Sequence, residues 1–116
     1  MTTKRDYRDY VEDILDAIEN TAQFIEGMAY EDFSGDTKTV YAVIRAFEII
    51  GEATKKLPPT IRNKYPEAPW REMAGIRDKL IHEYFGVNVA VVWKTAFEDL
   101  PALEPIIRRI LAESGT

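Results

Sequence analysis

The chain has 116 residues, and its 46% hydrophobic and 30% charged residues are typical of one globular domain with a single core. The absence of cysteine excludes disulfides, thiolate catalysis and cysteine-ligated metal sites, and the formal net charge of −5 disfavours a protein that coats nucleic acid. No apolar run approaches the ~18 residues that a membrane-spanning helix needs, so we expect a cytoplasmic protein with no membrane partner.

The first predicted element is an amphipathic helix over residues 7–25. Apolar side chains recur there at steps of three and four residues, which places them on one buried helix face, while the outward positions are acidic. Gly27 and the stretch 31–36 then interrupt the pattern and separate this helix from the next one.

The second predicted helix begins at Asp36 or Thr37, either of which can cap it, and continues to Leu57 with apolar residues at the same spacing. The pair Pro58-Pro59 stops it, because proline lacks the backbone N–H that a helix interior requires. A basic connector follows, which holds at most one short helical turn around residues 61–64.

The remaining chain predicts three more helices. A long one runs from Trp70 to Gly86, a residue suited to a left-handed C-terminal cap. Asn88 can cap a fourth helix over residues 89–97, and Pro101 opens a last one. No segment alternates as a strand does, so the predicted fold class is all-α, a single-domain bundle of four or five helices.

Basic residues are concentrated in one part of this acidic chain. Between Lys55 and Lys79 lie seven bases and three acids, a local net charge of +4, which leaves −9 for the rest. Two interpretations stay open here: a charge fluctuation on a solvated face, or a surface that meets phosphate.

His82, the only histidine, lies in this region close to Arg77 and Asp78. Histidine takes and gives protons near neutral pH, and the arginine fork fits a phosphate. At about 100° per residue Asp78 and His82 share a helix face, so the carboxylate can favour protonated imidazole, unless the two form only a surface contact. Arg77 and His82 are about 140° apart, which favours a composite site where two copies of the chain meet.

Two further groups have alternative interpretations. Tyr84 falls on the buried stripe of its helix, either as a core-edge side chain or with a reachable hydroxyl. Arg45, Glu48 and Glu52 form a solvated charge ladder, or Arg45 and Glu48 face a cleft and help to shape it. A metal site built from Glu48, Glu52 and His82 is disfavoured, because it has one histidine and no characteristic spacing.

The segment Arg77-x4-His82-x-Tyr84 resembles the R-x4-H-x-Y signature of the HepT-like branch of the HEPN ribonucleases, the toxin halves of toxin–antitoxin pairs. The surrounding sequence is also similar to that family, so the resemblance spans nearly the whole chain, residues 1–116 being one such domain. The similar blocks are residues 42–53 (AVIRAFEIIGEA), 65–71 (YPEAPWR), 82–87 (HEYFGV), 92–93 (VW) and 99–101 (DLP).

The resemblance implies a homodimer of helical bundles that cleaves RNA without a metal or other cofactor, using the ribose 2′-hydroxyl as nucleophile. His82 would transfer protons, and Arg77 would hold the scissile phosphate. Asp78, Arg45 and Glu48 would support these two catalytic residues. The candidate RNA-binding residues are Lys55, Lys56, Arg71 and Lys79.

The resemblance also implies a regulator, a minimal nucleotidyltransferase antitoxin of a type VII-like pair, which adds AMP to Tyr84. Asp78 stands where the family often has asparagine, and its negative charge beside the phosphate is expected to weaken RNA binding. The alternative function is a non-catalytic dimeric helical module that binds the nucleotidyltransferase or RNA without cutting it.

Overall fold

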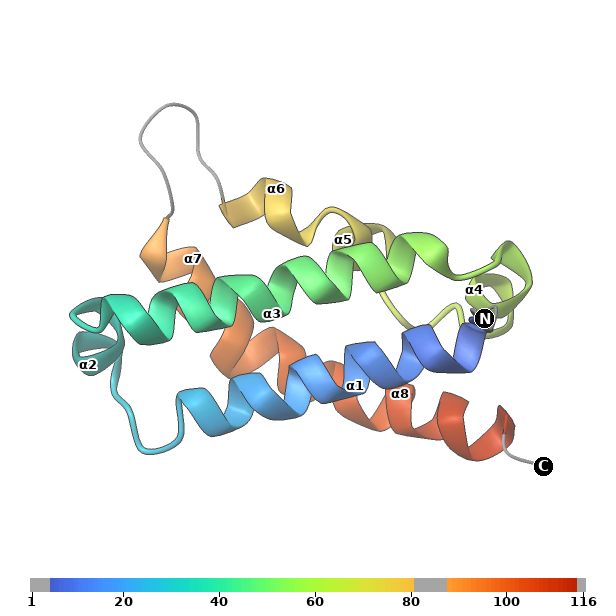
Figure 1. Cartoon of the computed structure of the whole chain (residues 1–116), viewed down its shortest axis with the longest axis horizontal. Helices are drawn as coiled ribbons and strands as arrows, with labels where there is room; N and C mark the ends of the chain where they lie inside the picture. Colours follow the sequence, from blue (N-terminus) through green and yellow to red (C-terminus); the bar gives the residue numbers. More distant parts are fainter. Residues whose placement is uncertain (1–4, 81–87, 115–116) are drawn as a thin grey trace, which may run out of the picture.

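The chain folds into a bundle of α-helices in the computed structural model, which describes residues 5–80 and 88–114, without the side chains of residues 79 and 80. Figure 1 shows three long helices that lie side by side, with α1 between the other two: α1 (Tyr7–Phe24), α3 (Thr37–Lys56) and α8 (Leu100–Ser114). Shorter helices pack against α3: α5 (Trp70–Ala74), α6 (Ile76–Leu80) and α7 (Val89–Lys94). The predicted all-α class is confirmed, and the described ranges contain no strand.

Local hydrogen bonds explain where the first two long helices begin. The Asp6 carboxylate accepts the backbone N–H of Arg8 at 2.8 Å, and the Asp9 carboxylate accepts that of Asp6 at 3.1 Å. Asp36 accepts the hydroxyl of Thr39 at 2.7 Å and its backbone N–H at 3.1 Å, and these bonds hold the pKa of the Asp36 carboxyl below its ordinary value. Both starts agree with the sequence prediction.

A single apolar core joins these helices. The apolar spacing read from the sequence places its side chains on the inner faces of α1, α3 and α8. The largest fully buried side chains are Phe33, Phe47, Ile14, Ile18, Ile50, Leu57, Leu100, Ile107, Ile110, Val11 and Val43. Among the described residues, no helix combines the length and apolar character that crossing a bilayer demands.

The interruption predicted after the first helix contains a helix of its own, α2 (Tyr30–Ser34). The Asp32 carboxylate accepts the backbone N–H of Ala29 at 2.9 Å and so stabilises the start of this single turn. Phe33 lies fully buried against the core. Five residues are too few for the periodic signal that reveals a helix, and the sequence pattern therefore missed it.

The predicted third helix is wrong as one continuous element. It is divided at Gly75, which ends α5 with its N–H bonded to Arg71 and precedes α6, where the N–H of Asp78 bonds to the Gly75 carbonyl at 2.9 Å. Glycine is a poor helix former, because fixing its backbone costs more entropy than for other residues. The cap predicted at Gly86 lies outside the described residues.

The predicted fourth and fifth helices form one continuous helical segment. Asn88 caps α7 as predicted, and α7 leads through a π-helical turn, η1 (Thr95–Asp99), into α8. The backbone N–H of Leu100 bonds to Thr95, five residues back. Pro101 is the second residue of α8, where a missing N–H is tolerated, so a helix begins there as predicted, although no loop separates it from η1.

The connector between α3 and α5 contains the short helix α4 (Pro59–Lys64), as predicted. The indole N–H of Trp70 donates to the carbonyl of Tyr65 at 2.9 Å and to that of Arg62 at 3.1 Å. The Tyr65 hydroxyl donates to the Glu113 carboxylate on α8 at 2.5 Å, and this bond, with burial, raises the pKa of Tyr65 to about 12. The connector is thereby joined to the start of α5 through Trp70 and to the C-terminal part of α8 through Glu113.

Candidate functional site

The candidate site lies where α3 passes the junction of α5 and α6. The two backbones approach closely at Gly51, since a Cβ atom there would lie 3.4 Å from the carbonyl oxygen of Ala74 and 3.5 Å from Cγ2 of Ile76. A side chain larger than that of alanine would have to push the α5–α6 junction away from α3. This close approach brings Arg77, on the first turn of α6, beside the polar face of α3.

A cleft of about 200 Å³ opens at this junction. Three of its lining residues are basic and two are acidic, so its lining is slightly positive in an acidic protein. The residues that line it are Arg45, Glu48, Gly51, Glu52, Lys55, Ala74 and Arg77.

Glu48 lies between two arginines at the centre of the cleft. Its Oε2 is 3.8 Å from Nε of Arg77 on α6, and its Oε1 is 3.5 Å from Nη1 of Arg45, one turn away on α3. The arginine side chains are 71% exposed at position 45 and 63% exposed at 77. Ion pairs this exposed are weak, so an incoming phosphate can replace the carboxylate as the partner of both guanidinium groups.

The structure thus brings together residues that the sequence separates by up to 32 positions. Arg77, predicted as catalytic, lies beside Arg45 and Glu48, predicted as supporting, and all three line this hollow, while their part in catalysis stays a prediction. Lys55, an RNA-binding candidate, lines the same cleft.

Other predicted residues lie elsewhere. Lys56 lines a separate hollow of about 220 Å³ together with Arg5 and Tyr10 near the start of α1. Arg71 is exposed on α5 and Asp78 is exposed on α6, and neither lines the cleft.

The remaining candidates fall beyond what the structure describes. His82 and Tyr84 lie outside the described residues, as does the side chain of Lys79. The contact between Asp78 and His82, the accessibility of Tyr84 and the composite site between two copies therefore stay predictions. In the described part of the chain, no group of three acidic or histidine side chains is placed to hold a metal ion.

Sequence reasoning missed the role of Gly51. The apolar spacing of the second helix assigns no role to Gly51, but a glycine within a long helix is costly unless another backbone approaches it. That cost was the signal in the sequence for the crossing of α3 and the α5–α6 junction. Ala74, which completes the crossing, carries no comparable signal.

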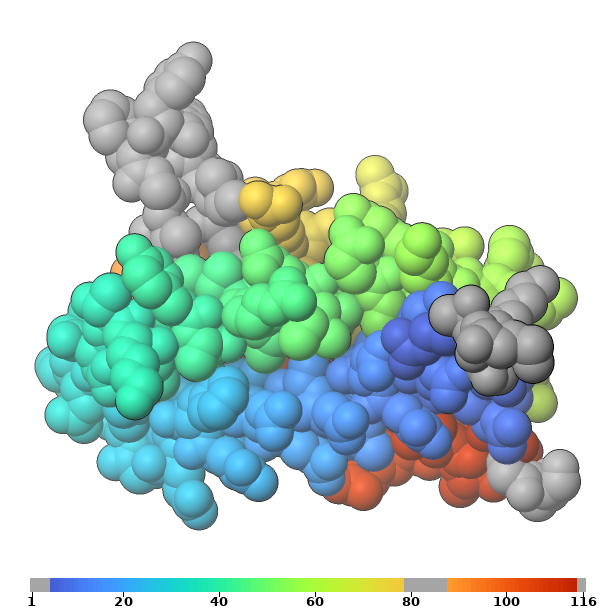
Figure 2. All heavy atoms as spheres, viewed as in Figure 1, coloured from blue at the N-terminus to red at the C-terminus, as the bar shows by residue number. Residues whose placement is uncertain are grey.

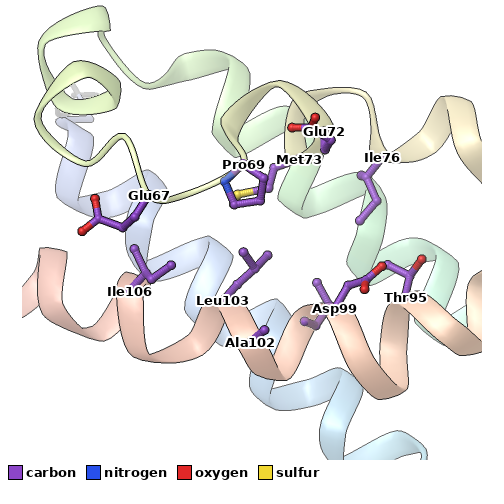
Figure 3. A pocket seen from close by; sticks show the side chains of 11 residues that line it. Glu67, Pro69, Glu72, Met73, Ile76, Thr95, Asp99, Ala102, Leu103 and Ile106 are labelled. Atoms are coloured by element: carbon purple, nitrogen blue, oxygen red, sulfur yellow. The ribbon is translucent and has the colours of Figure 1, made fainter.

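A larger hollow, about 590 Å³, lies between the α5–α6 side of the bundle and α8 (Figure 3). Apolar side chains such as Met73, Leu103 and Ile106 line most of it, and its charged lining residues are acidic: Glu67, Glu72 and Asp99. Since no base among the described residues lines it, this hollow does not suit phosphate, and we assign the candidate site to the cleft at Glu48.

The sequence matches a known protein family and several known proteins. A family described as HepT-like, "Ribonuclease HepT-like", matches residues 14–110. The chain is 56% identical to "Probable ribonuclease HepT" of Thermococcus cleftensis over 101 residues, which cover 87% of this chain and 92% of that protein.

Two further relatives have similar coverage. "Putative RNase TTE0752" of Caldanaerobacter subterraneus is 46% identical over 90% of this chain and 93% of its own length. "Putative RNase MJ1216" of Methanocaldococcus jannaschii is 44% identical over 95% of this chain and 91% of its own length. No solved structure matches the chain.

Proposed function

The chain belongs to the HepT-like ribonuclease family, and we propose that it is an endoribonuclease that cleaves RNA at the cleft between α3 and α6 without a metal ion. The observation that carries this proposal is the Glu48 carboxylate held between Arg45 and Arg77, with Lys55 lining the same cleft. Three cations around one hollow form a place for the scissile phosphate and its neighbour. Metal independence and the use of the 2′-hydroxyl are inferred from the family resemblance.

The proposed reaction is an internal transfer at phosphorus. His82 accepts the proton of the ribose 2′-hydroxyl, the 2′-oxygen forms a bond to phosphorus, and the bond from phosphorus to the 5′-oxygen of the next nucleotide breaks. The leaving oxygen takes up a proton, so the products end in a 2′,3′-cyclic phosphate and a 5′-hydroxyl. Arg77 stabilises the negative charge that develops on the phosphoryl oxygens, and Glu48 holds Arg77 in position beforehand.

We propose that two copies of the chain form the complete site. Arg77 and His82 point about 140° apart on a regular helix, so groups from a second copy would allow both to reach one phosphate. Mixing Arg77→Ala chains with His82→Ala chains tests this. Regained cleavage supports a site that both copies build, whereas a mixture as inactive as its components, with exchange of chains confirmed by mass, contradicts it.

The proposed regulator is a minimal nucleotidyltransferase that adds AMP to Tyr84, and the pair would act as a toxin and its antitoxin. An adenylyl group there would bring bulk and negative charge to the motif that also contains Arg77 and His82. After co-expression with such an enzyme, peptide mass spectrometry should find AMP on Tyr84 and cleavage should be lost. Modification at another residue would contradict this assignment.

Incubation of the purified protein with single-stranded RNA in excess chelator tests the catalytic proposal. We expect 2′,3′-cyclic phosphate ends, with cleavage lowered by about 10²-fold or more in Arg77→Ala and in His82→Ala. Arg108→Ala is the matched control, because it removes an exposed arginine on α8 that does not line the cleft, and it should cleave like wild type. RNA that binds but stays intact would instead favour the non-catalytic binding module.

A further inference from the structure

One face of α3 continues beyond the cleft toward the start of the helix. At about 100° per residue, Tyr41, Arg45, Glu48, Glu52 and Lys55 fall within about 80° of one another and form a single stripe, called here the α3 stripe. In the view of Figure 2, α3 lies across the front of the molecule above α1. Tyr41 is one helical turn from Arg45, a rise of about 6 Å.

Tyr41 is the most exposed large hydrophobic side chain in the described part of the molecule, at 67%. The other exposed aromatic side chains have neighbours. Phe97 stacks on Trp93 at 5.1 Å between centroids, Tyr30 meets the same ring edge-on at 6.2 Å, and Phe24 lines a hollow. Within the described residues, the side chain of Tyr41 has no ring contact and no hydrogen bond. Single exposed apolar side chains are common, and what distinguishes this ring is its place one turn from Arg45, which lines the cleft.

Cations lie on both sides of this ring. Lys38 is exposed on the preceding turn of α3, close to the Asp36 carboxylate, and Arg45 is exposed on the following turn. Arg45 pairs with Glu48 and shares a hollow with Asp13 and Asp16 of α1, and these exposed ion pairs are weak enough for a phosphate to replace the carboxylates. A ring between two cations fits an unpaired nucleotide, whose base stacks on the ring while the phosphates on either side meet the cations. The same surroundings suit an apolar surface of a second protein poorly, because docking there would bury two charges.

We propose that Tyr41 is the stacking platform for an unpaired RNA base adjacent to the phosphate held by Arg45 and Arg77. The inference rests on the proposed ribonuclease function and defines its substrate class: single-stranded RNA, since a base inside a duplex cannot stack on a protein ring. Stacking on one ring does not distinguish bases strongly, so the platform sets the register of the strand in the cleft rather than a sequence.

Binding of fluorescently labelled 2′-O-methylated oligouridine tests the platform apart from cleavage, because this RNA lacks the nucleophilic hydroxyl. Tyr41→Leu should raise the Kd about tenfold, and Tyr41→Phe should bind like wild type, since the ring alone provides the stacking surface. Phe97→Leu is the matched control, an exposed ring on η1, and should leave the Kd unchanged.

A series of the same oligonucleotide with one abasic position at a time identifies the base that stacks. At one position the missing base should weaken wild type about tenfold and have no effect on Tyr41→Leu. The inference is overturned if Tyr41→Leu binds like wild type, if no abasic position removes the difference, or if light scattering shows that the substitution dissociates a dimer in parallel with the loss of binding. Failure of wild type to cut unmodified RNA, with these binding results intact, would refute the catalytic proposal alone.

Discussion

Gly51 controls how closely α3 approaches the α5–α6 junction, and its replacement by alanine should stabilise the protein. The new Cβ would lie 3.4 Å from the Ala74 carbonyl oxygen and 3.5 Å from Cγ2 of Ile76, which are ordinary van der Waals distances. Alanine is favoured over glycine inside a helix by about 0.8–1 kcal/mol, and a buried methyl group adds at most about 0.8 kcal/mol. Because the carbonyl contact lies at the short limit of this range and offsets part of the gain, we expect the free energy of unfolding to rise by about 1 kcal/mol.

Leucine at the same position should have the opposite effect. Its γ and δ carbons would enter the space of the Ala74 carbonyl, and overpacking of this kind costs about 1–3 kcal/mol. The junction would move away from α3, which lengthens the distance from Arg77 to Glu48 beyond its present 3.8 Å. We therefore expect Gly51→Leu to lose both stability and RNA cleavage, and Gly51→Ala to keep cleavage.

Thermal unfolding and urea titration measure the stability of both variants. A gain of about 1 kcal/mol corresponds to a rise in Tm of about 4 °C for a domain of this size. A lower Tm for Gly51→Ala would mean that the added Cβ cannot be accommodated 3.4 Å from the Ala74 carbonyl oxygen, and wild-type behaviour of Gly51→Leu would mean that the junction leaves room for a larger side chain. Either result would refute the reasoning that this glycine determines the geometry of the cleft.

Three other predictions concern charge. Glu48→Gln removes one negative charge from the cleft and the ion-pair partner that Arg77 has before RNA binds, so the Kd for 2′-O-methylated RNA should fall several-fold while kcat for cleavage also falls; an unchanged kcat would argue against a positioning role. Asp78→Asn should tighten RNA binding at low salt, because Asp78 is an exposed acid next to Arg77, and identical titrations of the two proteins would count against this. For Tyr65, whose folded pKa of about 12 exceeds the ordinary 10.0, the stabilisation is complete below about pH 10 and is lost as the pH rises toward 12; urea unfolding should show the advantage of wild type over Tyr65→Phe shrinking over this interval.

The long helices could be predicted from the sequence because their signals are local. The apolar residues of α1 and α3 recur at helical spacing, and Asp36 stands where a cap is needed. The break at Gly75 and the π turn before Pro101 could not be predicted in the same way, because the apolar spacing continues across both. They depend on how closely α3 approaches and on how a proline is accommodated inside a helix, which spacing does not express.

The candidate site was predictable one element at a time but not as an assembly. The position of Arg77 in a basic segment suggested phosphate binding, and Arg45 with Glu48 suggested a polar helix face. Their meeting depends on packing between α3 and α6, residues far apart in the chain. Glycine at 51 is the only local sign of that packing, and it indicates a close approach without naming the partner.

The net charge of −5 and a phosphate-binding cleft are compatible because they act at different distances. Salt at physiological strength screens exposed charges beyond about 8 Å, so a phosphate at Glu48 responds mainly to Arg45, Lys55 and Arg77. Asp13 and Asp16 of α1 line hollows together with Arg45 and oppose it, while acids farther away contribute little. Those distant acids repel the rest of a polyanion as it approaches the remaining surface. An RNA strand is therefore attracted to this cleft and repelled by the acidic exterior. Because Glu48 and Asp78 place negative charge at or beside the cleft, their charges set how tightly the strand binds.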